Sequence, residues 1–141
     1  MQQLIEFAGN NFILSAIWVA LVAMLIYSFV SSAVSPVKEV NTHEATLLIN
    51  KEDAIVLDIR DAKSFNAGHI LGARQLKPEA IRNSQFGPLE KSKSKPIIVV
   101  CAMGNTARKT ALDLHKAGFA RATLLKGGMN AWQSAGLPVS K

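Results

Sequence analysis

An uncharged run of nineteen residues, Phe12 to Val30, constrains the fold more than any other feature of this sequence. About 20 helical residues, at ~1.5 Å each, cross the ~30 Å hydrocarbon core of a bilayer. The run is apolar on all sides, as a helix in lipid requires, and Tyr27 lies near its C-terminal end, where interfacial aromatic residues are common. The sequence therefore predicts one transmembrane helix at about residues 12–34, within an N-terminal segment 1–35.

A cleaved signal peptide is the alternative interpretation of this segment. Ser31-Ser32-Ala33 has the small residues of a cleavage site. However, Met1 to Asn11 contains no Lys or Arg, and the apolar core is longer than the usual ~7–15 residues. We favour the membrane anchor.

The residues after the helix suggest its orientation. No Lys or Arg precedes the run, whereas Lys38 and Lys51 follow it, so the positive-inside rule predicts an outer N-terminus and a cytoplasmic C-terminal domain. The only cysteine of the chain cannot form an internal disulfide, and a free thiol suits a reducing compartment. The proline in Ser35-Pro36-Val37 ends the helix, and residues 36–40 are expected to form a linker.

The remaining residues, 41–141, form a pattern of alternating strands and helices. Short apolar runs without alternation predict buried parallel strands at 54–59, 97–100 and 122–125. Helical patterns lie between them, and the first begins at Asn41 or Thr42, either of which can cap a helix. We therefore predict an α/β fold with a parallel sheet flanked by helices.

Cys101 directly follows the strand Ile97 to Val100, where sites form in parallel sheets. Gly104 allows a tight turn and Asn105 tolerates a left-handed conformation, so a loop leading into a helix N-terminus is expected. Backbone amides, the helix dipole near residues 107–110 and the charges of Arg108 and Lys109 would favour the thiolate over the thiol. A small buried hydrophobe is the alternative role for this cysteine.

Three ordered motifs make the chain resemble the rhodanese-domain sulfurtransferases. Cys101-Ala102-Met103-Gly104-Asn105-Thr106 resembles the active-site loop of that family. Two flanking stretches resemble its N-terminal and C-terminal signatures: Val56 to Arg60 followed by Gly68 to Ala73, and Leu124 to Trp132 followed by Gly136-Leu137-Pro138. With the preceding helix, the chain is similar to single-domain members anchored in the bacterial inner membrane by one helix, which would leave its N-terminus periplasmic.

The resemblance implies transfer of sulfane sulfur through a persulfide on Cys101. The donor would be thiosulfate or a persulfide, and the acceptor a thiol or cyanide. The backbone of Ala102 to Ala107 and the Arg108 side chain would bind the sulfur anion, with Asp58, Arg60 and Lys109 as possible supporting charges. No metal or organic cofactor is implied.

One departure from the family pattern leaves the donor open. The last loop position, often Arg or Lys in the family, is Thr106, although Arg108 or Lys109 would be able to substitute. The alternative function is a non-catalytic module that binds a membrane-protein partner through its helix, since a fold does not guarantee activity. Small residues for helix contact are present: Ser15, Ala16, Ala20, Ala23 and Ser28.

Other chemistries fit less well. A cysteine phosphatase needs an Arg six positions after the cysteine to grip phosphate, but Ala107 stands there. The three histidines show no metal-ligand spacing with Cys101, and His69 is expected to stabilise a turn. Residues 41–141 carry 15 Lys/Arg and 8 Asp/Glu, scattered without interleaved aromatics, which favours a cationic face near a membrane over nucleic-acid binding.

Overall fold

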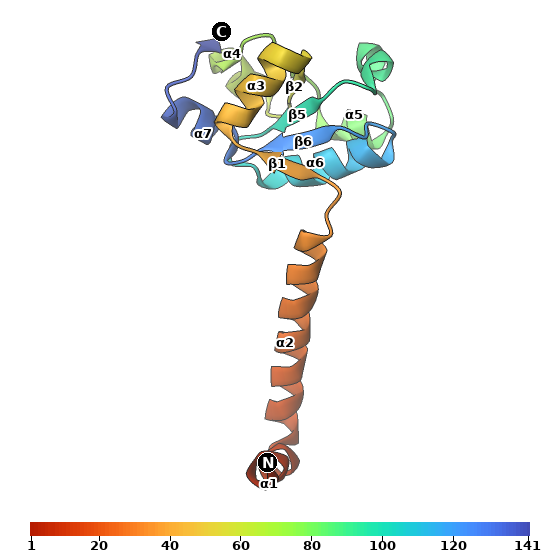
Figure 1. Ribbon diagram of the computed structural model, residues 1–141, viewed down its shortest axis with the longest axis vertical. Coiled ribbons are helices and arrows are strands. Elements are labelled where there is room, and N and C mark those ends of the chain that lie inside the picture. Colours follow the sequence, from red (N-terminus) through yellow and green to blue (C-terminus); the bar gives the residue numbers. More distant parts are fainter. The chain divides into compact units, whose positions relative to one another are not determined.

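The computed structural model describes residues 1–141, apart from the side chain of Ser32. The chain divides into two compact units, Met1–Ser35 and Pro36–Lys141. Figure 1 shows their helices and strands; the two units are described separately below.

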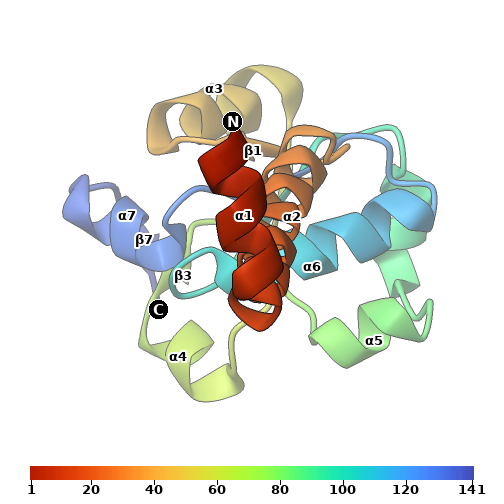
Figure 2. The same ribbon diagram turned by 90° about the horizontal axis from the view of Figure 1, so that it is seen from below.

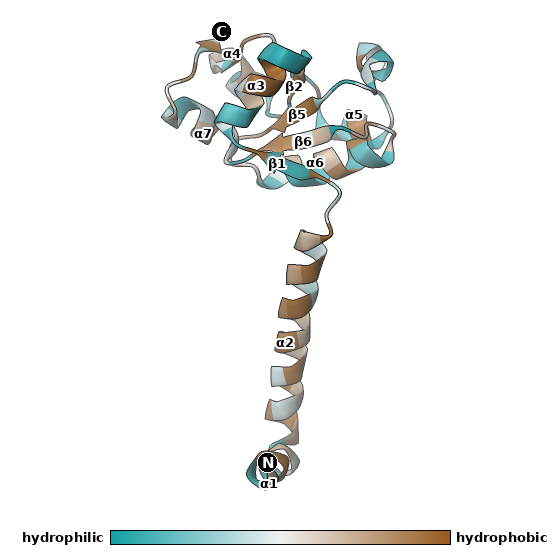
Figure 3. Ribbon diagram, in the orientation of Figure 1, coloured by the Kyte–Doolittle hydropathy of each residue, from teal (hydrophilic) through white to brown (hydrophobic). Residues whose placement is uncertain are grey.

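The first unit consists of two helices, α1 (Gln2–Asn10) and α2 (Phe12–Ala33). The 22 residues of α2 extend about 33 Å at ~1.5 Å per residue, which matches the bilayer core. In the described part of the chain, one stretch, Phe12–Ser31, is long and apolar enough to cross a membrane, and its side chains are not buried by the protein. Figure 3 shows apolar residues along the length of α2.

The second unit is a parallel five-stranded sheet, which confirms the predicted fold class. The strand order is β1-β6-β5-β2-β4, and every neighbouring pair is parallel. The strands of this sheet are β1 (Lys38–Val40), β2 (Ile55–Asp58), β4 (Arg74–Gln75), β5 (Ile97–Val100) and β6 (Ala122–Leu125). A separate antiparallel pair joins β3 (His69–Ile70) to β7 (Val139–Ser140).

Helices cover both faces of the sheet, which explains why its central strands are apolar without alternation. One face packs against α5 (Pro78–Arg82), the 3₁₀ helix η1 (Gly87–Ser92) and α6 (Asn105–Lys116). The other face packs against α3 (Thr42–Glu52) and α7 (Gly128–Ser134). The short helix α4 (Ala62–Ala67) follows β2. In β5, Ile97 and Val99 enter the first core and Ile98 and Val100 the second, all at most 1% exposed.

The start of α3 follows the predicted capping pattern. The Asn41 side chain accepts a hydrogen bond from the Glu44 amide at 2.8 Å, and the Glu44 carboxylate accepts one from the Asn41 amide at 3.0 Å. This reciprocal pair satisfies two amides that a helix N-terminus leaves without partners.

The expected linker at residues 36–40 is wrong in part. Residues Lys38 to Val40 form β1, paired with β6, and the Lys126 amide donates to the Val40 carbonyl at 2.9 Å. Val37 and Val40 are buried in the two cores. Three residues, two of them charged, carry too little pattern to be recognised as a strand. Their structure comes from pairing with a distant segment.

Candidate active site

Cys101 lies where the sequence predicted, directly after β5 at the carboxyl edge of the sheet. The residue is 7% exposed and belongs to the core under α6. The backbone amide of Gly104 donates a hydrogen bond to its Sγ at 2.8 Å. The Cys101 sulfur therefore accepts an amide hydrogen bond at the N-terminal end of α6.

The predicted loop is shorter than expected and its glycine makes the turn. Gly104 has φ +95° and caps α6, whereas Asn105 is the first residue of that helix. Gly104 reverses the chain, so Asn105 does not use the left-handed conformation that its side chain would tolerate. The helix dipole consequently begins at Asn105 and not near Ala107, which brings the amide-rich helix end closer to the sulfur.

The residues of the loop differ in their exposure. Ala102, Met103, Asn105 and Thr106 are exposed, and Met103 retains 65% of its accessible surface. Ala107 is completely buried and fixes the first turn of α6 to the sheet. Ala102 and Met103 thus form an apolar part of the surface around a mostly buried sulfur, beside the polar Asn105 and Thr106.

The turn before α7 fixes the loop from the other side. The amides of Met129 and Asn130 donate to the carbonyls of Cys101 and Ala102 at 2.8 and 3.1 Å. Gly128, at φ +57°, lies directly against the Cys101 carbonyl. The glycine pair 127–128 therefore makes the turn before α7 and lets that turn pack against the loop.

Arg108 is near the loop, but its charge is engaged. Its guanidinium forms an ion pair with Glu39 of β1, and both side chains are partly exposed. The sequence suggested a cation free to hold an anion, and it gave no indication of this partner. Lys109, the next residue of α6, is exposed.

Asp58 and Arg60 form a buried pair at the end of β2. Arg60 Nε and Nη2 donate to the Asp58 carboxylate at 2.8–3.1 Å, and Nη2 also donates to the Gly68 carbonyl at 2.7 Å. The Asp58 residue is 1% exposed. These contacts connect the end of β2 to the turn after α4, which gives the pair a structural role.

His69 and Asp61 stabilise the same turn region. The His69 Nδ1 donates to the Phe65 carbonyl at 2.9 Å, and the two rings stack at 3.9 Å between centroids. The Ser64 hydroxyl and amide donate to the Asp61 carboxylate and hold the pKa of that carboxyl below its usual value. Across the described residues, no group of three or more His, Cys, Asp or Glu is arranged to hold a metal ion.

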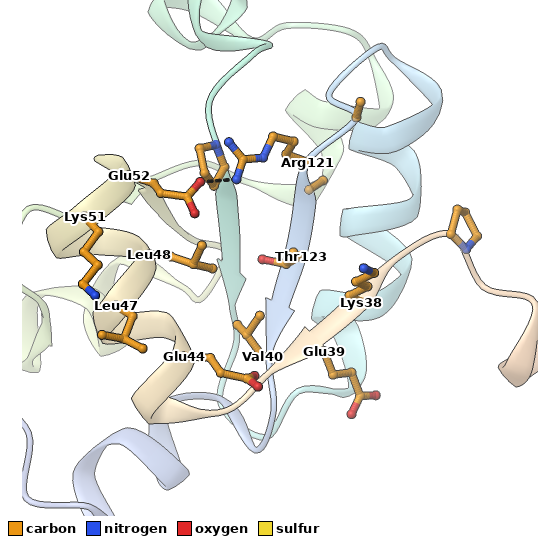
Figure 4. Close-up of a pocket in the computed structure, with 14 residues that line it drawn as sticks. Lys38, Glu39, Val40, Glu44, Leu47, Leu48, Lys51, Glu52, Arg121 and Thr123 are labelled. Carbon is orange, nitrogen blue, oxygen red and sulfur yellow. Dashed lines mark hydrogen bonds and ion pairs between the residues drawn. The ribbon is translucent and has the colours of Figure 1, made fainter.

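Among the hollows on this unit, two differ in their distance from the loop. One of about 340 Å³ adjoins it and is lined by Glu39, Met103, Gly104, Asn105, Arg108, Leu124, Lys126 and Gly127. A larger one of about 650 Å³ lies between α3 and strands β1 and β6, and no residue from 101 to 108 lines it. Figure 4 shows Leu48, Val40 and Thr123 facing this larger hollow, with the Glu52–Arg121 ion pair at one end.

Comparison with known proteins agrees with the geometry of the loop and sheet. Residues 41–135 match the model of the rhodanese-like domain. The chain therefore belongs to the rhodanese-like domain family. The resemblance found in the sequence is thereby confirmed.

Individual relatives cover the chain to different extents. It is 42% identical to YibN of Escherichia coli (strain K12) over 139 residues, which are 99% of this chain and 97% of YibN. It is 35% identical to the thiosulfate sulfurtransferase GlpE of Pseudoalteromonas translucida over 100 residues, 70% of this chain and 90% of GlpE. The solution structure of the rhodanese-like domain of Anabaena Alr3790 covers 72% of this chain and 77% of its own, at 30% identity and a TM-score of 0.64. The family match and the GlpE relative support a sulfurtransferase-type role.

Proposed function

We propose that this chain is a membrane-anchored sulfurtransferase that carries sulfane sulfur as a persulfide on Cys101. The observation that carries the proposal is the 2.8 Å hydrogen bond from the Gly104 amide to the Cys101 Sγ, at the N-terminal end of α6. The same donors that stabilise a thiolate stabilise a persulfide anion, which has the same charge one sulfur atom further out.

The reaction proceeds in two balanced steps. The Cys101 thiolate attacks the outer sulfur of thiosulfate, a new S–S bond forms, and the S–S bond of the donor breaks. Sulfite leaves with the electron pair, and the persulfide keeps one negative charge. An acceptor thiolate or cyanide then attacks the outer persulfide sulfur and regenerates the Cys101 thiolate.

Thiosulfate is one donor in this proposal, and a small-molecule or protein persulfide is the other. The printed name of the GlpE relatives supports thiosulfate. The exposed Thr106 and the engaged Arg108 leave the loop without an unpaired cation at the usual family position, which favours a donor that needs less charge recognition. The acceptor is a thiol or cyanide.

The anchor is α2, which would cross a bacterial inner membrane once. Lys38 and Lys51 follow this helix and no Lys or Arg precedes it, so we place the N-terminus in the periplasm and the rhodanese domain in the cytoplasm. Protease treatment of spheroplasts tests this orientation: the domain should be protected, and its digestion from the periplasmic side would reverse it.

Intact mass spectrometry of the full chain tests the chemistry. After incubation with thiosulfate or a persulfide donor, the wild type should gain about 32 Da, the mass of one sulfur atom, and should lose it when cyanide is added. Cys101→Ser, which removes the only cysteine, should gain nothing. A wild-type protein that remains unmodified with every donor would favour the non-catalytic module that binds a membrane partner.

A further inference from the structure

Helix α1 is separated from α2 by a break at a single residue. Asn11 has φ −126° and ψ 52°, outside the helical region, and both its amide and its side-chain nitrogen donate to the Phe7 carbonyl, at 3.0 and 3.3 Å. Within this unit α1 lies across the axis of α2. Figure 1 shows α1 end-on below the vertical α2, and Figure 2, turned by 90°, shows α1 along its length.

The nine residues of α1 divide into two faces. Residues four apart share one side of a helix, which gives Gln2, Glu6 and Asn10 a common polar face. The opposite face is apolar and consists of Leu4, Ile5, Phe7 and Ala8. Its large side chains are 70%, 72% and 59% exposed at Leu4, Ile5 and Phe7, so the chain itself does not cover them.

We infer that α1 lies in the lipid–water interface, with its apolar face among the glycerol groups and upper acyl chains. This inference rests on the membrane anchor proposed above. Since one residue separates α1 from a span that begins at Phe12, α1 is held at the headgroup level of the membrane. A helix that crosses the axis of a span at that level runs parallel to the membrane surface.

Two other placements of α1 fit the observations less well. If α1 continued α2 into the bilayer, residues 2–33 would form a rod of about 48 Å, longer than the ~30 Å core, and Glu6 would approach hydrocarbon. If α1 extended into water, three large apolar side chains would stay solvated. The break at Asn11 and the interfacial position avoid both costs.

The charge of α1 specifies how it binds lipid. It contains no Lys or Arg, and Glu6 is its only charged side chain. Insertion of apolar side chains, and not attraction to anionic headgroups, therefore holds it in place, so its depth should be the same in neutral and anionic lipid. An α1 fixed in this way sets the depth at which α2 enters the membrane.

Depth-dependent quenching of a fluorescent label tests the inference on the full chain in nanodiscs. In a Cys101→Ser background, single cysteines at Leu4→Cys and Glu6→Cys carry an environment-sensitive dye. Two residues of helix rotate the side chain by about 200°, so the labels occupy opposite faces of one turn. The Leu4 label should be quenched at least about twofold more by a nitroxide near the glycerol than by one at the acyl terminus. The Glu6 label should stay open to aqueous iodide.

Leu21→Cys, in the middle of α2, separates the anchor from the inference. Its label should be quenched most by the acyl-terminal nitroxide, and failure there would overturn the anchor itself. With that control satisfied, iodide access at both α1 positions would show that α1 leaves the membrane, open to water or a protein partner. If the acyl-terminal nitroxide quenched both α1 labels most strongly, α1 would continue the membrane span. Either result overturns the inference.

Discussion

Gly128 lies so close to Cys101 that no side chain fits between them. A Cβ built on Gly128 would stand 2.1 Å from the Cys101 carbonyl oxygen and 2.8 Å from the carbonyl carbon of Ala102. Both atoms belong to the backbone, so the contact cannot be relieved by rotation of a side chain. The helix α7 is thereby fitted directly onto the cysteine loop, and its amides reach the loop carbonyls.

Gly128→Ala should displace the cysteine loop and slow persulfide formation by about 100-fold or more, because an ~1 Å misplacement at a reacting group costs about that much. Unfolding free energy should fall by about 1–3 kcal/mol, from the positive φ and the forced contact together. The rate is measured by intact mass and the stability by urea denaturation.

Gly136→Ala is the matched control for this prediction. Gly136 also has a positive φ, +69°, but an added Cβ would meet nothing within 4 Å. This variant should carry only the backbone cost of about 1 kcal/mol and keep the reactivity of Cys101. Equal reactivity in the two variants would contradict a role for the Gly128 contact.

The sequence predicted the buried centre of the fold but not its margins. The strands β2, β5 and β6 were recognisable because helices cover both faces, which demands continuous apolar runs. By contrast, β1, β3 and β7 have two or three residues each and acquire their structure from pairing. The helix α1 went unrecognised because its apolar face contacts no core.

The cysteine loop was predictable for a local reason, whereas its electrostatics were not. The strand, Cys101, Gly104 and the following helix are adjacent in sequence. The ion pair of Arg108 joins residues 69 positions apart, and Glu39 lies in the segment expected to be a linker. No periodicity or motif connects these two residues, so only the register of β1 on β6 brings them together.

The buried pair of Asp58 and Arg60 should be important for stability. Asp58→Asn removes the charge opposite a guanidinium whose side chain is only 12% exposed. An unpaired buried charge is costly, so we expect a loss of about 3 kcal/mol in unfolding free energy. Denaturation is followed by the fluorescence of the buried Trp132 in a Trp18→Phe background, which leaves a single tryptophan.

Glu79→Gln provides the comparison for the buried pair. Its partner is Arg82, and both side chains are at least half exposed. Exposed pairs contribute about 0–1 kcal/mol, so this loss should be small. If Asp58→Asn cost no more than Glu79→Gln, the pair would not secure the strand end. If it instead abolished persulfide formation in folded protein, a direct role at the site would replace the structural one.

The ion pair between Glu39 and Arg108 should restrain anion binding beside the loop. Glu39→Gln frees a guanidinium next to the smaller hollow and removes one negative charge. We expect the rate of persulfide formation from thiosulfate to rise roughly threefold at low salt, and less at high salt because the charges are screened. In an Arg108→Gln background most of this gain should disappear.

Glu52→Gln is the control for the effect of overall charge. Glu52 pairs with Arg121, which precedes β6 at the opposite end of the sheet from Cys101. The substitution Glu52→Gln changes the net charge by the same amount as Glu39→Gln, without freeing a cation near the loop. An equal acceleration by Glu52→Gln and Glu39→Gln would indicate that only the total charge matters.

In our proposal, Thr106 weakens the recognition of an anionic donor, because it leaves no cation at this position of the loop. Thr106→Arg would place a cation in the first turn of α6, two residues after Gly104, whose amide donates to the Cys101 Sγ. Because Thr106 is exposed, the substitution should change stability by no more than about 0.5 kcal/mol. A charge-assisted contact with thiosulfate should lower its KM by about tenfold. Steady-state kinetics with cyanide as acceptor measures this change, and Thr106→Gln controls for side-chain size.

Equal KM values in the Arg and Gln variants would show that position 106 does not contact the donor. Recognition of thiosulfate would then fall to Arg108 and Lys126, which line the smaller hollow.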